Sequence, residues 1–165
     1  MSPTVPGWAA GLDLAPHPEG GWYGETWRSD LTLSHEVLPS AHSGDRSAGT
    51  AILFLLPDGA ESAWHTVVGA EIWLHHRGSP IELVVGGTGS APGAETTIVL
   101  GSDLASGQRP QHVVAPGEWQ RARPVAGHPD GAGLVSCVVV PGFDFADFGL
   151  LDPPPADDPA PSGGA

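Results

Sequence analysis

The chain has 165 residues, 40% of them hydrophobic, which is enough for one domain with a sizeable buried core. Its 19 acidic residues against six arginines give a formal charge of −13, which argues against binding to nucleic acid or to an anionic membrane surface. No lysine is present, which excludes Schiff-base catalysis and a lysine-linked cofactor. The single cysteine, Cys137, excludes an intrachain disulfide framework and a thiolate metal cluster. No apolar run has the length of a membrane span, and the opening MSPTVPGW lacks the pattern of a secretory signal, so we expect a cytoplasmic protein.

Short apolar runs alternate along the chain with turn sequences rich in glycine (24 residues) and proline (18 residues). Eight or more short strands at this spacing predict an all-β fold, either a sandwich or a barrel. The predicted strands are, in chain order, 21–27, 50–56, 62–67, 71–75, 81–85, 96–100, 112–115 and 134–140.

Helices are scarce in this pattern. The best candidate is 6–14, a short N-terminal helix with Trp8 and Leu12 on one side. Residues 1–150 form one predicted domain. The segment 151–165 is rich in proline and aspartate and has almost no bulky apolar groups, so we expect a mobile tail.

Two acid–base residues, His65 and Glu71, fall on neighbouring predicted strands. Alternate residues of a strand share a face, so both side chains lie close together if that face is the barrel interior. Such a pair binds a metal, performs general acid–base catalysis, or serves only as a hydrogen-bonded structural pair. Further along, a Pro-Gly turn at 116–117 leads Gln120 into another strand, a pattern that is weak by itself.

These positions resemble the two sequence motifs of the cupin superfamily. His65, Val67, Glu71 and Gly78 match the first motif, which usually reads His-x-His, three or four residues, Glu, six residues, Gly. The segment 115–120 is similar to the second motif, Pro-x-Gly-x-x-His, with alanine at the proline position and glutamine at the last histidine.

Further segments resemble one branch of that superfamily, the cupin-5 family, which is largely of unassigned function. They read HPEGGWY followed by ETWRS, then AILFLL, SAWH and PGFDFADF, in this order along the chain. The resemblance covers about residues 12–150. It implies a double-stranded β-helix, the jelly-roll barrel of the cupins, with a pocket in the barrel mouth. It also implies a homodimer, which exposed edge strands favour as well.

Departures from the family pattern bear on the cofactor. Metal-binding cupins resemble one another in three histidines and one glutamate, and of these the chain keeps only His65 and Glu71. Val67 cannot ligate a metal, and Gln120 offers only a neutral carbonyl oxygen. The resemblance therefore implies either no cofactor or a weakly held divalent metal ion at His65, Glu71 and Gln120.

Without a metal, these residues suit acid–base chemistry, as in the metal-independent sugar epimerases of the same superfamily. In this hypothesis His65 is the base and Glu71 orients it. Tyr23 or Gln120 then stabilises the negative charge that develops on the substrate. The alternative for Tyr23 is a core aromatic residue with its hydroxyl satisfied.

The remaining candidates are substrate contacts. Strand alternation puts Tyr23 and Glu25 on one face and Arg28 on the other, and either face could meet the pocket. Arg28 is either an anchor for a substrate carboxylate or phosphate, or one half of an ion pair. His17 and Glu19 of the HPEGG segment either close the pocket as a lid or form a structural turn.

Three tryptophans, Trp64, Trp73 and Trp119, flank the proposed site residues and are either core residues or walls for a ring-shaped or apolar ligand. The resulting hypothesis is a protein that binds a small polar metabolite and acts as an isomerase, epimerase or lyase. Two alternatives stay open. One is a small-molecule-binding cupin without chemistry, and the other is a divalent-metal-dependent enzyme with an incomplete ligand set.

Overall fold

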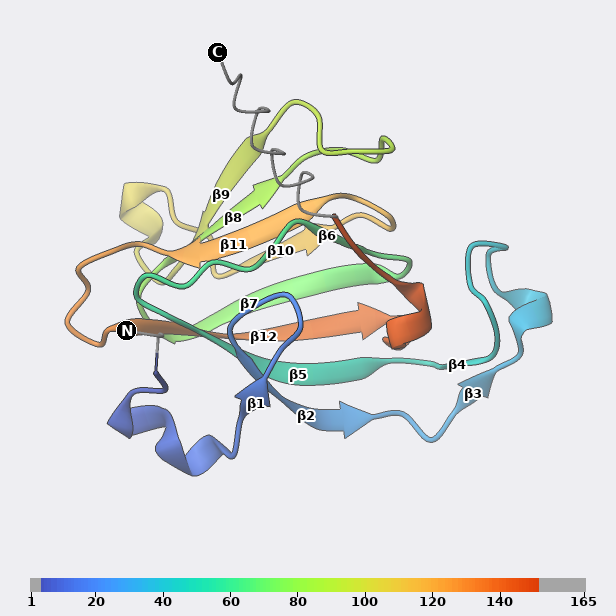
Figure 1. Ribbon diagram of the computed structural model, residues 1–165, viewed down its shortest axis with the longest axis horizontal. Helices are drawn as coiled ribbons and strands as arrows, with labels where there is room; N and C mark the ends of the chain where they lie inside the picture. The colour runs from blue at the N-terminus through green and yellow to red at the C-terminus, as the bar shows by residue number, and fades with distance from the viewer. Residues whose placement is uncertain (1–3, 152–165) are drawn as a thin grey trace, which may run out of the picture.

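The computed structural model describes residues 4–151, which fold into two facing antiparallel sheets (Figure 1). The larger sheet has the strand order β1 (Ala15–Pro16), β2 (Trp22–Arg28), β5 (Thr50–Pro57), β12 (Ala132–Val140), β7 (Ala70–Gly78) and β10 (Gln111–Val114). The smaller sheet has the order β13 (Phe148–Leu150), β6 (His65–Val67), β11 (Gln120–Pro124), β8 (Ile81–Val85) and β9 (Thr96–Leu100). This arrangement confirms the predicted double-stranded β-helix.

The core lies between the two sheets, and strand alternation builds it. In β5, Phe54 and Leu56 point inward, and they meet Trp73 from β7 and Leu83 from β8. Each of these side chains is at most 1% exposed. Burying one such side chain contributes about 1.5–3 kcal/mol of transfer free energy, so this layer holds the two sheets together.

All eight predicted strands are present, within a few residues of their predicted ends. The pattern does not predict β1, β13 or the two-stranded arm of β3 (Thr32–Leu33) and β4 (Arg46–Ser47), because two or three residues are too few to show an alternation. The predicted tail at 151–165 lies outside the described residues, apart from Leu151.

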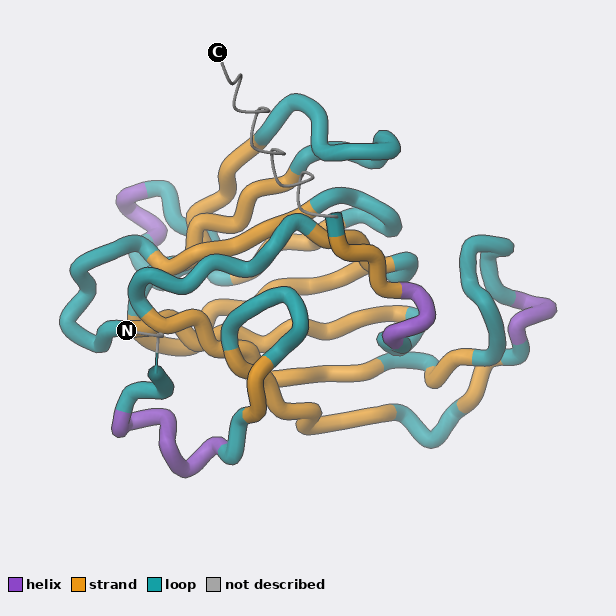
Figure 2. The backbone as a smooth tube through the Cα atoms, in the orientation of Figure 1, coloured by secondary structure: helices purple, strands orange, loops and turns teal. Residues whose placement is uncertain are grey.

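The helical segments are short 3₁₀ turns (Figure 2), namely η1 (Gly7–Leu12), η2 (His35–Val37), η3 (Leu104–Ser106) and η4 (Phe145–Asp147). The predicted N-terminal helix is thus the 3₁₀ helix η1, which ends where Asp13 takes a left-handed conformation at φ 49°. Its Trp8 packs in a second cluster with Leu55 and Leu134, on the outer face of the six-stranded sheet. No helix among the described residues is long and apolar enough to cross a membrane.

Candidate functional site

Strand pairing brings the residues of the two sequence motifs together inside the barrel. Gln120 of β11 lies directly opposite His65 of β6, and both are fully buried. The Gln120 carbonyl oxygen accepts a hydrogen bond from Trp73 Nε1 at 2.9 Å, and its amide nitrogen donates to Glu71 Oε2. These four residues, His65, Glu71, Trp73 and Gln120, together with Glu19 form what we call the buried polar cluster.

The protonation of this cluster follows from its hydrogen bonds. His65 Nδ1 lies 2.8 Å from the carbonyl oxygen of Ala63, which can only accept, so Nδ1 carries the hydrogen. His65 Nε2 then presents a lone pair to Glu19 Oε2 at 3.3 Å. Burial lowers the pKa of His65 to about 4, and burial together with the nearby Glu71 raises the pKa of Glu19 well above its ordinary value. A neutral imidazole that accepts a hydrogen from a protonated Glu19 satisfies both groups.

Glu71 is held in a similar way from several sides. Burial raises its pKa from 4.5 to about 7, and hydrogen bonds from Gln120, Cys137 and Trp73 oppose that rise. Burial is the largest cause that raises the pKa of the Cys137 thiol well above its ordinary value, and the charge of the Glu71 carboxyl is the next. Cys137 is therefore a buried, protonated thiol that donates to Glu71.

The buried polar cluster does not fit the divalent metal ion that metal-binding cupins hold. His65 Nε2 faces Glu19, and both ends of the Gln120 amide are engaged by Trp73 and Glu71. Over residues 4–151, no three His, Cys, Asp or Glu side chains are grouped so that they could hold a metal ion.

A cavity of about 330 Å³ lies beside this cluster, on the inner face of β2, β5 and β12. Its volume is in the range of small-molecule sites. Two predicted candidates, His17 and Tyr23, border it with their rings 4.6 Å apart and nearly perpendicular. The other lining residues are Glu25, Arg28, Thr50, Ile52, Cys137, Val139, Phe143, Asp144 and Phe145.

His17 connects the cavity with the buried polar cluster. Its Nδ1 accepts a hydrogen bond from the backbone N–H of Glu19 at 3.3 Å and lies 3.5 Å from the Glu19 carboxyl. The Nε2 atom therefore carries the hydrogen, and within residues 4–151 no hydrogen-bond partner is found for it. Burial lowers the pKa of His17 to about 4, so the ring is neutral at pH 7. Glu19 supports His17 from behind and is not itself a lining residue of the cavity.

A bulge in β2 corrects the prediction that Arg28 faces away from Tyr23 and Glu25. The pairing of β2 with β5 shifts register between Glu25 and Trp27, and one extra residue reverses the faces that follow it. Tyr23, Glu25 and Arg28 consequently all line the cavity, whereas Trp27 is 51% exposed.

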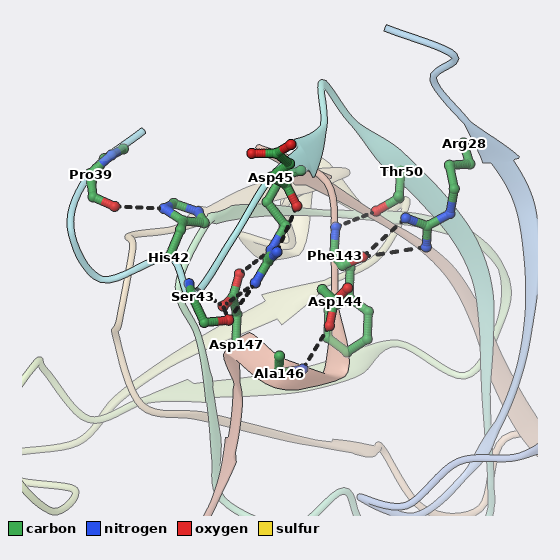
Figure 3. A network of polar contacts seen from close by, with 11 residues as sticks. Arg28, Pro39, His42, Ser43, Asp45, Thr50, Phe143, Asp144, Ala146 and Asp147 are labelled. Carbon is green, nitrogen blue, oxygen red and sulfur yellow. Dashed lines mark hydrogen bonds and ion pairs between the residues drawn. The ribbon is translucent and has the colours of Figure 1, made fainter. Parts of the chain in front are cut away.

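The outer wall of the cavity is the PGFDFADF segment, which is fastened at both ends (Figure 3). At one end, the Phe143 backbone N–H donates to Thr50 Oγ1 at 2.9 Å, and its carbonyl oxygen accepts from Arg28 at 3.3 Å. At the other end, Asp147 forms a buried ion pair with Arg46, with 2.6 Å between Oδ2 and Nε. These ties hold Phe143 and Phe145 over the cavity.

The three predicted tryptophans, all of them described by the structure, do not line this cavity. Trp73 is a core residue, and Trp119 donates to the carbonyl oxygen of Gly89 at 2.8 Å. The guanidinium carbon of Arg121 lies over Trp64, 5.0 Å from the centre of the indole ring.

Sequence reasoning missed most of the apolar lining. The inward positions of β5 and β12 supply Thr50, Ile52, Cys137 and Val139. Alternation along the two predicted strands placed these residues on one face, but nothing in the pattern told a cavity wall from a filled core.

The barrel, its interior histidine and the ligand-sized cavity define a protein of the cupin class. The chain belongs to the family described as Cupin superfamily (DUF985), whose model matches residues 7–151. An uncharacterized protein of Saccharomyces cerevisiae, YML079W, is 32% identical over 145 residues, which cover 84% of this chain and 70% of the yeast protein.

Solved structures agree with this assignment. A hypothetical protein from Leishmania major has 32% identity and a TM-score of 0.76, covering 87% of this chain and 85% of its own. Protein SO0799 from Shewanella oneidensis has 33% identity and a TM-score of 0.73, covering 90% of this chain and 85% of its own.

Two more distant structures share the fold alone. A double-stranded β-helix protein from Klebsiella pneumoniae has 16% identity and a TM-score of 0.52, with 87% of this chain and 94% of that chain covered. A variant of oxalate decarboxylase from Bacillus subtilis has 12% identity and a TM-score of 0.53, with 85% of this chain and 31% of that chain covered. The fold thus has distant neighbours that are enzymes.

Proposed function

We propose that the cavity binds a small polar metabolite and that His17 and Tyr23 exchange protons with it, in an isomerase, epimerase or lyase reaction. One observation carries the proposal. A neutral imidazole with a free N–H and a phenol share one wall of a ligand-sized cavity, 4.6 Å apart between ring centres. Paired groups of this kind perform general acid–base catalysis without a metal.

The roles differ from those that the sequence motifs suggest. His65 and Glu71 are fully committed to protein partners, so in this proposal they support the site from inside the core. As His17 gives its Nε2 proton to the substrate, its Nδ1 takes up the proton that the Glu19 carboxyl carries 3.5 Å away, so the imidazole stays neutral and Glu19 becomes the carboxylate. Tyr23, on the same wall, accepts on its hydroxyl oxygen the proton that leaves the substrate, while its own hydroxyl hydrogen passes to solvent.

Proton exchange with solvent gives a test that needs no known substrate. The protein is incubated in D₂O with a panel of small polar metabolites, and proton NMR records the loss of carbon-bound hydrogens. The wild type should exchange at least one compound, and His17→Ala should slow that exchange by at least about 100-fold. His35→Ala, at an exposed position on η2, is the matched control and should retain the wild-type rate.

A single result would refute this role for His17. Undiminished exchange by a folded His17→Ala protein leaves no place for the proposed acid. Binding of a panel compound without exchange would instead favour a small-molecule-binding cupin without chemistry.

We also propose that two copies of the chain form a dimer through the outer face of the six-stranded sheet. One row of paired residues crosses five strands of this face without a charge: Val113, Ile72, Val138, Ala51 and Trp27. The outermost two, Val113 and Trp27, are 54% and 51% exposed. Copies that each carry a charge of −13 repel one another, so an uncharged apolar face is the favourable one for self-association.

Light scattering coupled to size exclusion tests this pairing. The wild type should elute with twice the chain mass, and Trp27→Glu should elute as a monomer. Val37→Glu, on a 74% exposed residue of η2, should leave the dimer intact. A monomeric wild type contradicts the proposal.

A further inference from the structure

The rim of the cavity carries an unequal set of charges. Glu25 and Asp144 contribute two carboxylates, and Arg28 contributes one guanidinium. His17 adds none at neutral pH, because burial lowers its pKa to about 4. The lining therefore has a net charge of −1 (two negative groups against one positive), on a chain whose total charge is also strongly negative.

Arg28 is not free to bind an anion. Its Nε and Nη2 donate to the two oxygens of Glu25 at 3.0 and 2.7 Å, and Nη1 and Nη2 both donate to the Phe143 carbonyl oxygen at 3.3 Å. A guanidinium has five N–H groups, so these contacts leave one of them. Firm recognition of a carboxylate or phosphate needs two parallel N–H groups, and Glu25 occupies the Nε/Nη2 pair while the Phe143 carbonyl occupies the Nη1/Nη2 pair.

The Asp144 carboxylate at the rim, by contrast, can still accept a hydrogen bond. Asp144 is exposed, and its Oδ1 caps the turn at Ala146 while the second oxygen has no hydrogen-bond partner within residues 4–151. The aromatic residues Tyr23, Phe143 and Phe145 line the same cavity. Carboxylates beside aromatic faces are the surroundings in which proteins bind alkylated ammonium groups.

We infer that the cavity selects a small organic cation with an ammonium group, and that Glu25 sets this selection by masking Arg28. The inference rests on the proposed ligand cavity, but it requires none of the proposed proton chemistry. Asp144 attracts the cation directly, and the aromatic rings contact its alkyl groups. Removal of the Glu25 charge should expose Arg28 and turn the same cavity toward anions.

Three probes of one shape separate charge from size. Choline carries the cation, 3,3-dimethylbutan-1-ol replaces its nitrogen by carbon, and 3,3-dimethylbutanoate carries a negative charge on the same branched skeleton. Calorimetric titration of the full chain should give the tightest binding for choline, by about tenfold over the alcohol, and the weakest for the anion. Added salt should reduce the preference for choline and leave the affinity for the alcohol unchanged.

Two variants test the mechanism of selection. Glu25→Gln should weaken choline and strengthen 3,3-dimethylbutanoate, each by about tenfold, which reverses the order of the two probes. Asp144→Asn should weaken choline by about threefold without a comparable gain for the anion, since Arg28 stays paired with Glu25. Glu36→Gln, on η2 outside the cavity lining, is the charge-matched control and should bind all three probes like the wild type.

Several results would overturn the inference. One is that the wild type binds choline and the alcohol with equal affinity, and another is that it binds the anion most tightly. It would also contradict the inference if the wild type did not bind choline at millimolar concentration. An unchanged order of probes in Glu25→Gln would remove the masking role of that residue. The D₂O exchange assay with wild type and His17→Ala then shows separately whether the proposed acid–base function stands.

Discussion

The buried polar cluster and the cavity contain similar residue types in opposite situations. In the cluster, Gln120 is 0% exposed and its amide is bonded at both ends, so the sequence-motif positions are saturated by protein partners. In the cavity, His17 and Tyr23 border open volume, and His17 retains a free N–H. The contrast teaches that a motif residue can sit at its family position and still serve the core, and our proposal therefore assigns the proton exchange to His17, before β2, and to Tyr23, within it.

The largest expected effect comes from breaking the cluster. Gln120→Ala removes the amide that bridges the Glu71 carboxyl and the Trp73 Nε1–H in the core. Such groups lose their compensation for desolvation, so the free energy of unfolding should fall by about 3 kcal/mol. Urea denaturation measures this loss.

The matched control is Gln111→Ala, at an exposed glutamine of β10, which should change the free energy of unfolding by less than about 0.5 kcal/mol. If Gln120→Ala is as stable as this control, the cluster is not the structural unit that we describe.

Glu71 makes the stability of the cluster depend on pH. Its pKa is about 7 in the fold against 4.5 ordinarily, so the folded chain binds the extra proton between these values. The stabilisation is fully present below pH 4.5 and is lost as pH rises through 7, by at most about 3 kcal/mol. In Glu71→Gln the part of this slope that Glu71 contributes should disappear from urea titrations run at a series of pH values, while Glu19, whose pKa is also raised, keeps its own part.

A comparison variant isolates that slope from the many other carboxyl groups. Glu36→Gln, on an exposed turn, should keep the wild-type dependence between pH 4.5 and 7. The same dependence in Glu71→Gln would show that another group titrates in this range.

The barrel could be predicted well from sequence, because short alternating runs and turn residues depend on local physics. The eight strands follow from that pattern, whereas the inward direction of His65 and Glu71, both buried, stayed conditional until the structure placed them inside the barrel. The resemblance implied one site for His65, Glu71 and Gln120, and in the structure β11 pairs with β6 so that Gln120 lies opposite His65.

The cavity could not be predicted in the same way, for two physical reasons. The face of Arg28 depends on a single-residue bulge in β2, which alternation does not show. Whether Ile52 and Cys137 border a cavity or a filled core depends on where the PGFDFADF segment lies, and the Arg46–Asp147 ion pair fastens one end of that segment. That pair spans 101 positions along the chain and leaves no local signal.

Cys137 marks the border between the two regions, since it lines the cavity and donates to Glu71. Burial and the nearby Glu71 and Glu19 raise the pKa of its thiol, so little thiolate is present at neutral pH. A thiol reagent should therefore label the native protein at least about 100-fold more slowly than the urea-unfolded protein. Rapid labelling in the native state would mean that the cavity opens directly onto a reactive thiolate.

The smallest expected effect is that of metal removal. His65, Glu71 and Gln120 already have protein partners at each atom that would face a metal, so a bound ion would have to break the contacts to Glu19 and Trp73. Dialysis against a chelator should therefore shift the unfolding temperature by less than about 1 °C, because only a ligand of the folded state stabilises it. Thermal unfolding before and after dialysis, with elemental analysis of untagged protein, measures both quantities. A metal present near one equivalent, together with a drop of several degrees on its removal, would show that the cluster rearranges around an ion. The proposed chemistry would then have to be assigned to the cluster and not to the cavity.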